Sequence, residues 1–179
     1  TAELADSLGI DNRILPATDD AVRTTVQLAD GSRISFQDYF VKRRHRDTVA
    51  ALEYDGAAAS RPAPGVVAAI DRADLVVIAP SNPPLSIWPI LAVPDIRPAV
   101  ERASRVVAVS PLFGGRALKG PAAEVMASLG LPPGTPGVLA AYQGLLTTLV
   151  VDSEDAADEA LSTERTRILT ADTRIADRA

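Results

Sequence analysis

Apolar and polar residues alternate along residues 22–28 and again along 33–36. A period of two is typical of strands with one buried face. The Asp30-Gly31 pair between the two runs favours a tight turn. The pattern therefore predicts a β-hairpin near the start of the chain.

Four further elements are expected around this hairpin. Leu4 and Leu8 have helical spacing, and Gly9 suits the left-handed conformation that closes many helices. The patterns predict, in order, a helix over 1–9, a short strand over 13–15, a short helix over 36–41 and a strand over 48–54.

The second half of the chain contains three continuous apolar runs, at 75–79, 105–109 and 146–151. Such runs are expected for central parallel strands that are buried on both faces. Helical patterns between and before them fall at 64–72, 96–103 and 122–129, and residues 168–171 are a candidate edge strand.

Strands that alternate with helices imply right-handed crossovers and a mostly parallel sheet with helices on both faces. The expected fold class is α/β, a Rossmann-like doubly wound sheet with a small β-hairpin insertion. The hairpin region spans residues 13–56 and the Rossmann-like core spans 63–151 of the 179 residues.

Composition narrows the function classes. With 47% hydrophobic residues the chain can bury one core, and its lack of cysteine excludes thiolate metal sites and thiol nucleophiles. The net charge of -5 argues against nucleic-acid binding, although residues 42–46 form one short basic run. No stretch has the ~18–20 apolar residues of a membrane helix, so we expect a cytoplasmic protein that binds no membrane.

The first candidate site follows the run at 75–79. In open parallel sheets, ligands bind beyond the carboxyl ends of the strands. There the chain carries a proline-stiffened loop with neutral hydrogen-bond donors: Pro80, Ser81, Asn82, Pro83 and Ser86. The simpler interpretation is that the prolines end a strand and that Asn82 or Ser86 caps a helix.

The second candidate loop follows the run at 105–109. Gly114 and Gly115 permit close backbone approach, and Arg116 and Lys119, which precedes Gly120, supply cations for an anionic group. The spacing matches neither the P-loop nor the dinucleotide fingerprint. The alternative is a flexible connector with solvated cations.

Other chemistry is sparse. The loop Thr18-Asp19-Asp20 offers the adjacent carboxylates of its two aspartates, which suit a divalent cation, but aspartates also favour turns. The acidic stretch at 152–159 is expected to be a helix start, with Ser153 as its cap. The single histidine, His45, lies in the basic run, where a solvated position is expected. For Trp88 and Phe113, packing is the expected role, although each aromatic ring also suits stacking on a planar ligand.

Several motifs together resemble the phospholactate transferase family of coenzyme F-420 biosynthesis. They agree in order and spacing and cover nearly the whole chain: residues 15–20, 36–41, 80–91 and 110–121. Within them, Ala79 replaces an expected glycine and Phe113 an expected aliphatic residue.

The resemblance implies a phosphotransferase. It would move a phospholactyl group, or a phosphoenolpyruvyl group, from a guanosine-diphosphate-linked donor to the deazaflavin Fo and release GMP. Mg²⁺ dependence, a Rossmann-like fold and a homodimer are implied as well. On this basis Ser81, Asn82 and Ser86 would hold phosphate or the nucleotide, and Gly114, Gly115 and Lys119 would close around the donor.

One departure from the family pattern is large. The family begins with a strand and a glycine-rich loop, followed by segments with metal-binding aspartates, which have no counterpart here. The chain therefore resembles the last half to two-thirds of such a protein. We expect the metal ligands to lie outside it and the chain by itself to be inactive. A nucleotide-sugar-binding regulator of the same superfamily, or an unrelated nucleotide-binding interaction module, remains the alternative.

Overall fold

The hairpin predicted near the N-terminus is present and belongs to a three-stranded antiparallel sheet. In the computed structural model, which describes residues 2–118 and 120–174, its strands are β1 (Arg23–Leu28), β2 (Arg33–Ser35) and β3 (Val49–Asp55). The order is β2-β1-β3, with Val26 opposite both Ile34 and Leu52. The hairpin prediction is confirmed.

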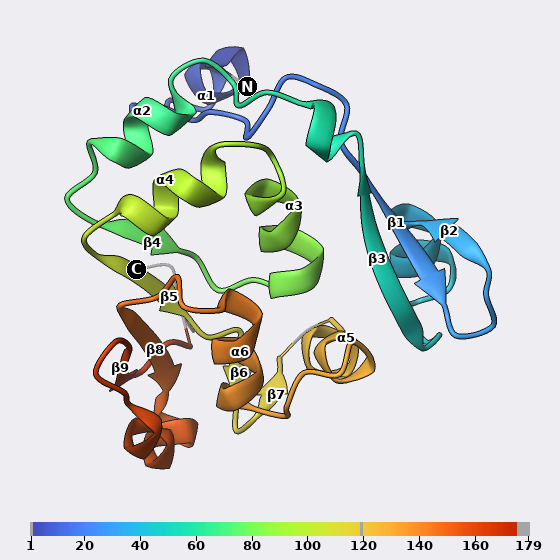
Figure 1. The fold of residues 1–179 in the computed structure, drawn as a ribbon, viewed down its shortest axis with the longest axis vertical. Helices are drawn as coiled ribbons and strands as arrows, with labels where there is room; N and C mark the ends of the chain where they lie inside the picture. The colour runs from blue at the N-terminus through green and yellow to red at the C-terminus, as the bar shows by residue number, and fades with distance from the viewer. Residues whose placement is uncertain (1, 119, 175–179) are drawn as a thin grey trace.

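A four-stranded parallel sheet forms the second unit of the architecture (Figure 1). Its order is β4-β5-β8-β9, in which every neighbouring pair is parallel. The strands are β4 (Val76–Ile78), β5 (Val106–Val109), β8 (Thr148–Asp152) and β9 (Arg167–Ala171). The α/β class is therefore confirmed, and residues 168–171 do lie in an edge strand.

Helices and a second, two-stranded hairpin complete the fold. The short hairpin consists of β6 (Leu112–Phe113) and β7 (Arg116–Ala117). The helices and helical turns are α1 (Ala2–Ser7), η1 (Asp38–Lys42), η2 (Ala57–Ala59), α2 (Val66–Asp71), η3 (Pro83–Ile87), α3 (Trp88–Leu91), α4 (Ile96–Arg102), α5 (Ala122–Ser128), α6 (Thr135–Tyr142) and η4 (Ser153–Leu161). None of the helices in the described ranges is long and apolar enough to cross a membrane.

Two predicted elements need correction. Residues 13–15 form no strand, and their three positions are extended or irregular chain that ends at Pro16. Such a short apolar run has no partner strand in this part of the structure. At the helix after β8, the cap is Asp152 instead of Ser153, since the Asp152 side chain accepts from the Glu154 N–H.

The prediction for residues 75–79 was also wrong in one respect. The segment contains a parallel strand, but β4 lies at the end of the described sheet and pairs only with β5. Ile78 is buried, whereas Val77 points to the opposite face and is 58% exposed. The run is thus buried on one face only, and among the described residues β4 has a neighbouring strand on one edge only.

The hairpin sheet packs against η3 and α5 through a core of its own. Val26, Leu28 and Val49 from the hairpin sheet pack in one cluster with Leu85 of η3 and Val125 of α5. In addition, the Tyr54 hydroxyl of β3 donates to the Pro84 carbonyl at 2.6 Å. These contacts hold the hairpin sheet against the loop that follows β4.

Candidate functional site

The loop after β4 is shaped by a helix cap. The Asn82 Oδ1 atom accepts from the Leu85 N–H at 3.2 Å, and Pro83 and Pro84 occupy the first two positions of η3. Proline suits these positions because their N–H groups have no intrahelical partner. The Ser86 N–H donates to the Asn82 carbonyl at 2.9 Å. The orientation of the Asn82 amide is therefore fixed by the local sequence.

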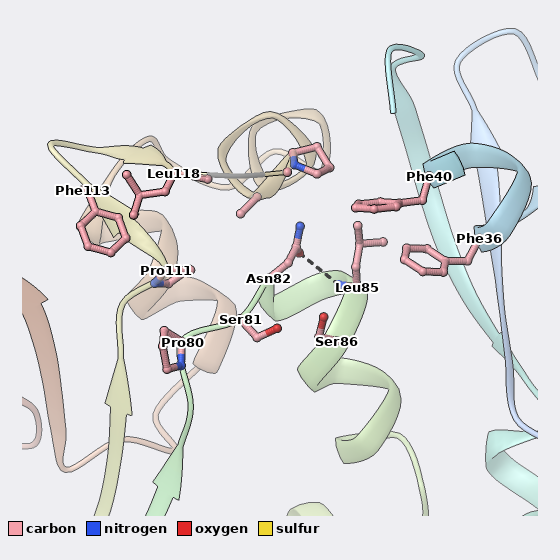
Figure 2. Close-up of a pocket in the computed structure, with 14 residues that line it drawn as sticks. Phe36, Phe40, Pro80, Ser81, Asn82, Leu85, Ser86, Pro111, Phe113 and Leu118 are labelled. Atoms are coloured by element: carbon pink, nitrogen blue, oxygen red, sulfur yellow. Dashed lines mark hydrogen bonds between the residues drawn. The ribbon is translucent and has the colours of Figure 1, made fainter. Parts of the chain in front are cut away.

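This loop forms one wall of a cavity of about 410 Å³ beyond the carboxyl ends of β4 and β5 (Figure 2). The volume lies within the usual range for small-molecule sites. The lining residues are Phe36, Phe40, Pro80, Ser81, Asn82, Leu85, Ser86, Pro111, Phe113, Ala117, Leu118, Gly120, Pro121 and Ala122. Among these described residues the lining carries no charged side chain.

Four of the five residues predicted for the first loop line this cavity. They are Pro80, Ser81, Asn82 and Ser86, while Pro83 is buried inside η3. The helix-capping interpretation also holds for Asn82. The Asn82 oxygen therefore caps η3, and the Asn82 nitrogen points toward the cavity (Figure 2).

The Asn82 Nδ2 atom is buried and has no hydrogen-bond partner in the described part of the chain. Figure 2 shows this nitrogen rising between Leu118 on one side and the ring of Phe40 on the other. A buried donor without a partner costs about 1–3 kcal/mol. A ligand oxygen or nitrogen that accepts from Nδ2 would remove this cost.

An aromatic wall faces the loop from the hairpin region. The rings of Phe36 and Phe40 are stacked with centroids 5.4 Å apart, and Phe40 is 40% exposed. The His45 ring lies behind Phe40, with a centroid distance of 5.4 Å. These two phenylalanines were not among the predicted site residues. Their spacing of four residues in a predicted helix was the signal that they share one face.

The two glycines of the second loop lie outside the cavity lining. Gly114 and Gly115 form the turn between β6 and β7, both with positive φ, and face η4. The Gly115 N–H donates to Asp155 Oδ1 at 2.8 Å, and a Cβ on Gly114 would lie 3.1 Å from Glu154 Oε2. A carboxylate of the protein itself therefore occupies the position predicted for a ligand anion.

The same loop does reach the cavity further along. Gly120 lines it, close enough to Phe40 that a Cβ on this glycine would lie 4.0 Å from the Phe40 ring. Lys119 is outside the described residues. Arg116 does not line the cavity.

Two carboxyl groups near the turn have opposite pKa shifts. Burial raises the pKa of Asp155 above its usual value, which the hydrogen bond from Gly115 opposes. The pKa of Asp152 is lowered, first by the Glu154 N–H and then by the hydrogen bonds from Thr173. Both carboxylates therefore hold the helix η4 and the chain around it, and neither lines the cavity.

The predicted loop of Thr18, Asp19 and Asp20 is a structural turn and does not line the cavity. Asp20 Oδ2 accepts from the Arg61 N–H at 2.8 Å, and the Thr18 hydroxyl donates to the Arg61 carbonyl at 2.6 Å. These bonds support the turn interpretation. Across residues 2–118 and 120–174, no group of three or more acidic, histidine or cysteine side chains could hold a metal ion.

The two other aromatic candidates differ. Trp88 packs against the main core and donates from Nε1 to the Ala141 carbonyl at 2.8 Å, so its expected packing role is confirmed. Phe113 lines the cavity, and the Arg174 guanidinium lies 5.3 Å from the centre of its ring.

Comparisons with known proteins agree with this architecture. The family model of 2-phospho-L-lactate transferase CofD matches residues 1–177. A 2-phospho-L-lactate transferase from Methanosarcina acetivorans is 38% identical over 159 residues, which are 89% of this chain and 51% of that protein. A phosphoenolpyruvate transferase from Streptomyces griseus is 42% identical over 149 residues, 80% of this chain and 47% of that protein.

A UPF0052-family protein from Bacillus halodurans has a similar solved structure. The TM-score is 0.61 at 17% identity, over 95% of this chain and 54% of that protein. This likeness supports the fold. The chain spans about half the length of the relatives that it matches.

Proposed function

Because this chain belongs to the 2-phospho-L-lactate transferase (CofD) family, we propose that it supplies part of a transferase site of coenzyme F-420 biosynthesis. The reaction moves a phospholactyl or phosphoenolpyruvyl group from a guanosine-diphosphate-linked donor to the deazaflavin Fo and releases GMP. Relatives named for either acid match at comparable identity, so the proposal includes both.

The observation that carries this proposal is the position of the cavity. It lies beyond the carboxyl ends of β4 and β5, between the two loops on which the family resemblance rests. Ligands of parallel α/β sheets bind at this edge. The hydrogen-bonding side chains of Ser81, Asn82 and Ser86 line it, and Asn82 Nδ2 has no partner among the described residues.

The chemistry requires positioning more than a reactive side chain. In the proposed reaction a hydroxyl oxygen of Fo attacks the phosphorus that carries the three-carbon acid and gives up its proton. The bond from that phosphorus to the bridging oxygen breaks, and GMP leaves with that oxygen. No cysteine exists in the chain, and His45 does not line the cavity. The contribution of these residues is therefore to bind and orient the substrates.

The proposal includes Mg²⁺, but the described residues do not fit this metal by themselves. The described cavity lining contains no carboxylate. Asp152 accepts from the Glu154 N–H and Asp155 accepts through Oδ1 from the Gly115 N–H, and neither of these aspartates lines the cavity. We therefore assign no step of the reaction to a metal held by this chain. The homodimer is likewise a proposal, which analytical ultracentrifugation can test.

Binding measurements test the proposed function. We expect Fo and guanosine nucleotides to raise the melting temperature of the chain and to give saturable heats in calorimetry. Stabilisation by uridine sugars alone would favour the nucleotide-sugar-binding alternative. If neither Fo nor any guanosine nucleotide binds, the proposed function is wrong for this chain.

A further inference from the structure

The β6-β7 hairpin is a small element for one that forms part of a cavity wall. Its register consists of two residue pairs, Leu112 with Ala117 and Phe113 with Arg116. A two-stranded hairpin is marginal by itself, so its position depends on the neighbours that hold it. Leu112 is one anchor, because its side chain is buried in the main core. Phe113 points to the opposite face of the strand and lines the cavity, so that anchor does not fix its ring.

The chain after β9 provides a support for this ring. The Arg174 guanidinium lies 5.3 Å from the centre of the Phe113 ring, which is within the range of a cation–π contact. Arg174 Nη2 also donates to Glu154 Oε1 at 3.0 Å, so the guanidinium is held from a second direction. The same carboxylate lies against the hairpin turn, since a Cβ on Gly114 would be 3.1 Å from Glu154 Oε2. Arg174 therefore connects η4 to the ring in the cavity wall.

The backbone that carries Arg174 is fixed as well. The N–H and the hydroxyl of Thr173 both donate to Asp152 Oδ2, at 3.1 and 2.9 Å. Asp152 is buried, and its other oxygen caps η4 through the Glu154 N–H. Residues 173–174 are thus tied to the carboxyl end of β8. A side chain that starts from a fixed backbone costs less entropy to order, which suits it to orient a neighbour.

The simpler role for Arg174 is a surface ion pair. The side chains of Arg174 and Glu154 are 46% and 51% exposed, and a solvated pair of this kind contributes little to stability. That role explains the bond to Glu154 but not the position of the guanidinium over an aromatic ring. Phe113 stands where the family pattern has an aliphatic residue, and an aliphatic side chain makes no cation–π contact.

We infer that Arg174 is a positioning residue of the site: it holds the Phe113 ring and thereby fixes the wall that the β6-β7 hairpin gives to the cavity. Arg174 itself does not line the cavity, so it acts through the ring. Without the guanidinium the ring is free to turn, and part of the binding energy is then spent on ordering it. The inference rests on the proposed function only where ligand affinity is measured.

Ring signals test the inference without a ligand. The chain has three phenylalanines, so NMR spectra of isotope-labelled phenylalanine separate Phe113 from Phe36 and Phe40. We expect Arg174→Ala to shift the Phe113 ring signals and to leave those of the other two rings unchanged. Arg174→Lys keeps a cation and should restore part of the shift. The matched control is Arg167→Ala, which removes the same charge from an exposed position on β9 and should shift none of the three.

Affinity is the second measurement. For whichever of Fo and the guanosine nucleotides binds, we expect Arg174→Ala to weaken binding about 2- to 5-fold, which corresponds to about 0.5–1 kcal/mol. In a Phe113→Leu background, Arg174→Ala should cause no further loss, because the ring that it holds is gone. Arg167→Ala should bind like the unmodified chain. Thermal melts first confirm that each variant is folded.

The inference is overturned if the Phe113 signals stay unchanged in Arg174→Ala, or if Arg174→Ala weakens binding equally in the Phe113→Leu background. The second result would show that Arg174 contacts the ligand or acts through another group. Failure of the proposed function is a different result, in which the unmodified chain binds neither Fo nor any guanosine nucleotide. The ring signals of the ligand-free chain then decide by themselves whether Arg174 positions Phe113.

Discussion

Replacing Asn82 by aspartate separates the two roles that its amide has in the structure. The oxygen caps η3 through the Leu85 N–H, and the nitrogen is an unpartnered donor. Aspartate caps helices about as well as asparagine, so Asn82→Asp should leave the free energy of unfolding nearly unchanged. Asn82→Ala removes the cap and should lower this free energy by about 1 kcal/mol.

For ligand affinity the order of the two variants should be reversed, with Asn82→Asp weakened more than Asn82→Ala. Asn82→Asp places an anionic acceptor where the ligand also presents an acceptor, so a donor is lost and repulsion is added. A lost bond with an unsatisfied partner costs about 1–3 kcal/mol, which corresponds to roughly 5- to 150-fold weaker binding. Asn82→Ala should lose less affinity, because it adds no repulsion.

Urea unfolding and calorimetric titration with Fo and with a guanosine nucleotide measure the two quantities on the same samples. The reasoning is refuted if Asn82→Asp binds as tightly as the unmodified chain. It is equally refuted if Asn82→Asp is destabilised as strongly as Asn82→Ala, because the Oδ1 cap would then not explain the side-chain orientation.

Three other substitutions test how the parts of the fold are held. Tyr54→Phe removes the hydrogen bond from the hairpin sheet to η3 and should lower the free energy of unfolding, measured by urea titration, by about 0.5–1.5 kcal/mol. An unchanged free energy of unfolding would show that this bond does not stabilise the fold. Gly56→Ala should lower the free energy of unfolding by about 2 kcal/mol or more, because φ is +86° and the new Cβ would lie 2.4 Å from the Ala21 carbonyl oxygen. A melting temperature equal to that of the unmodified chain would contradict this expectation. Asp152→Asn should lower the melting temperature at pH 7, and the difference should shrink as pH falls below 3.8. The lowered native pKa of Asp152 adds stability that is fully present above the unfolded value of 3.8 and is lost as pH falls through the native pKa. A pH-independent difference would show that charge is not the cause.

Local signals were sufficient where neighbours in sequence determine the structure. Asp30 and Gly31 form the predicted turn, in which the Asp30 carboxylate accepts from the Ser32 N–H. The cap on η3 was likewise readable from Asn82 and the prolines after it. Such interactions join residues two or three positions apart, so they can be predicted from the sequence.

The composition of the cavity depended on contacts that no local pattern encodes. Phe40 and Asn82 lie far apart in the chain and meet because the hairpin sheet packs on η3 and α5. The Gly114-Gly115 pair looked like an anion cradle because the position of η4 could not be known. Once folded, that helix supplies the anion itself through Asp155.

The exposed Val77 shows a related limit of pattern reading. A continuous apolar run indicates burial on both faces of a strand, whereas Val77 lies on a face of β4 that the described residues leave exposed. The run therefore predicted the strand correctly and its burial incorrectly.

The distribution of charge connects these observations to function. Neutral donors and aromatic rings surround the cavity, whereas the carboxylates of η4 are used to hold the β6-β7 turn. The side chains that the described lining offers to a ligand are therefore uncharged, and their polar atoms are those of Ser81, Asn82 and Ser86.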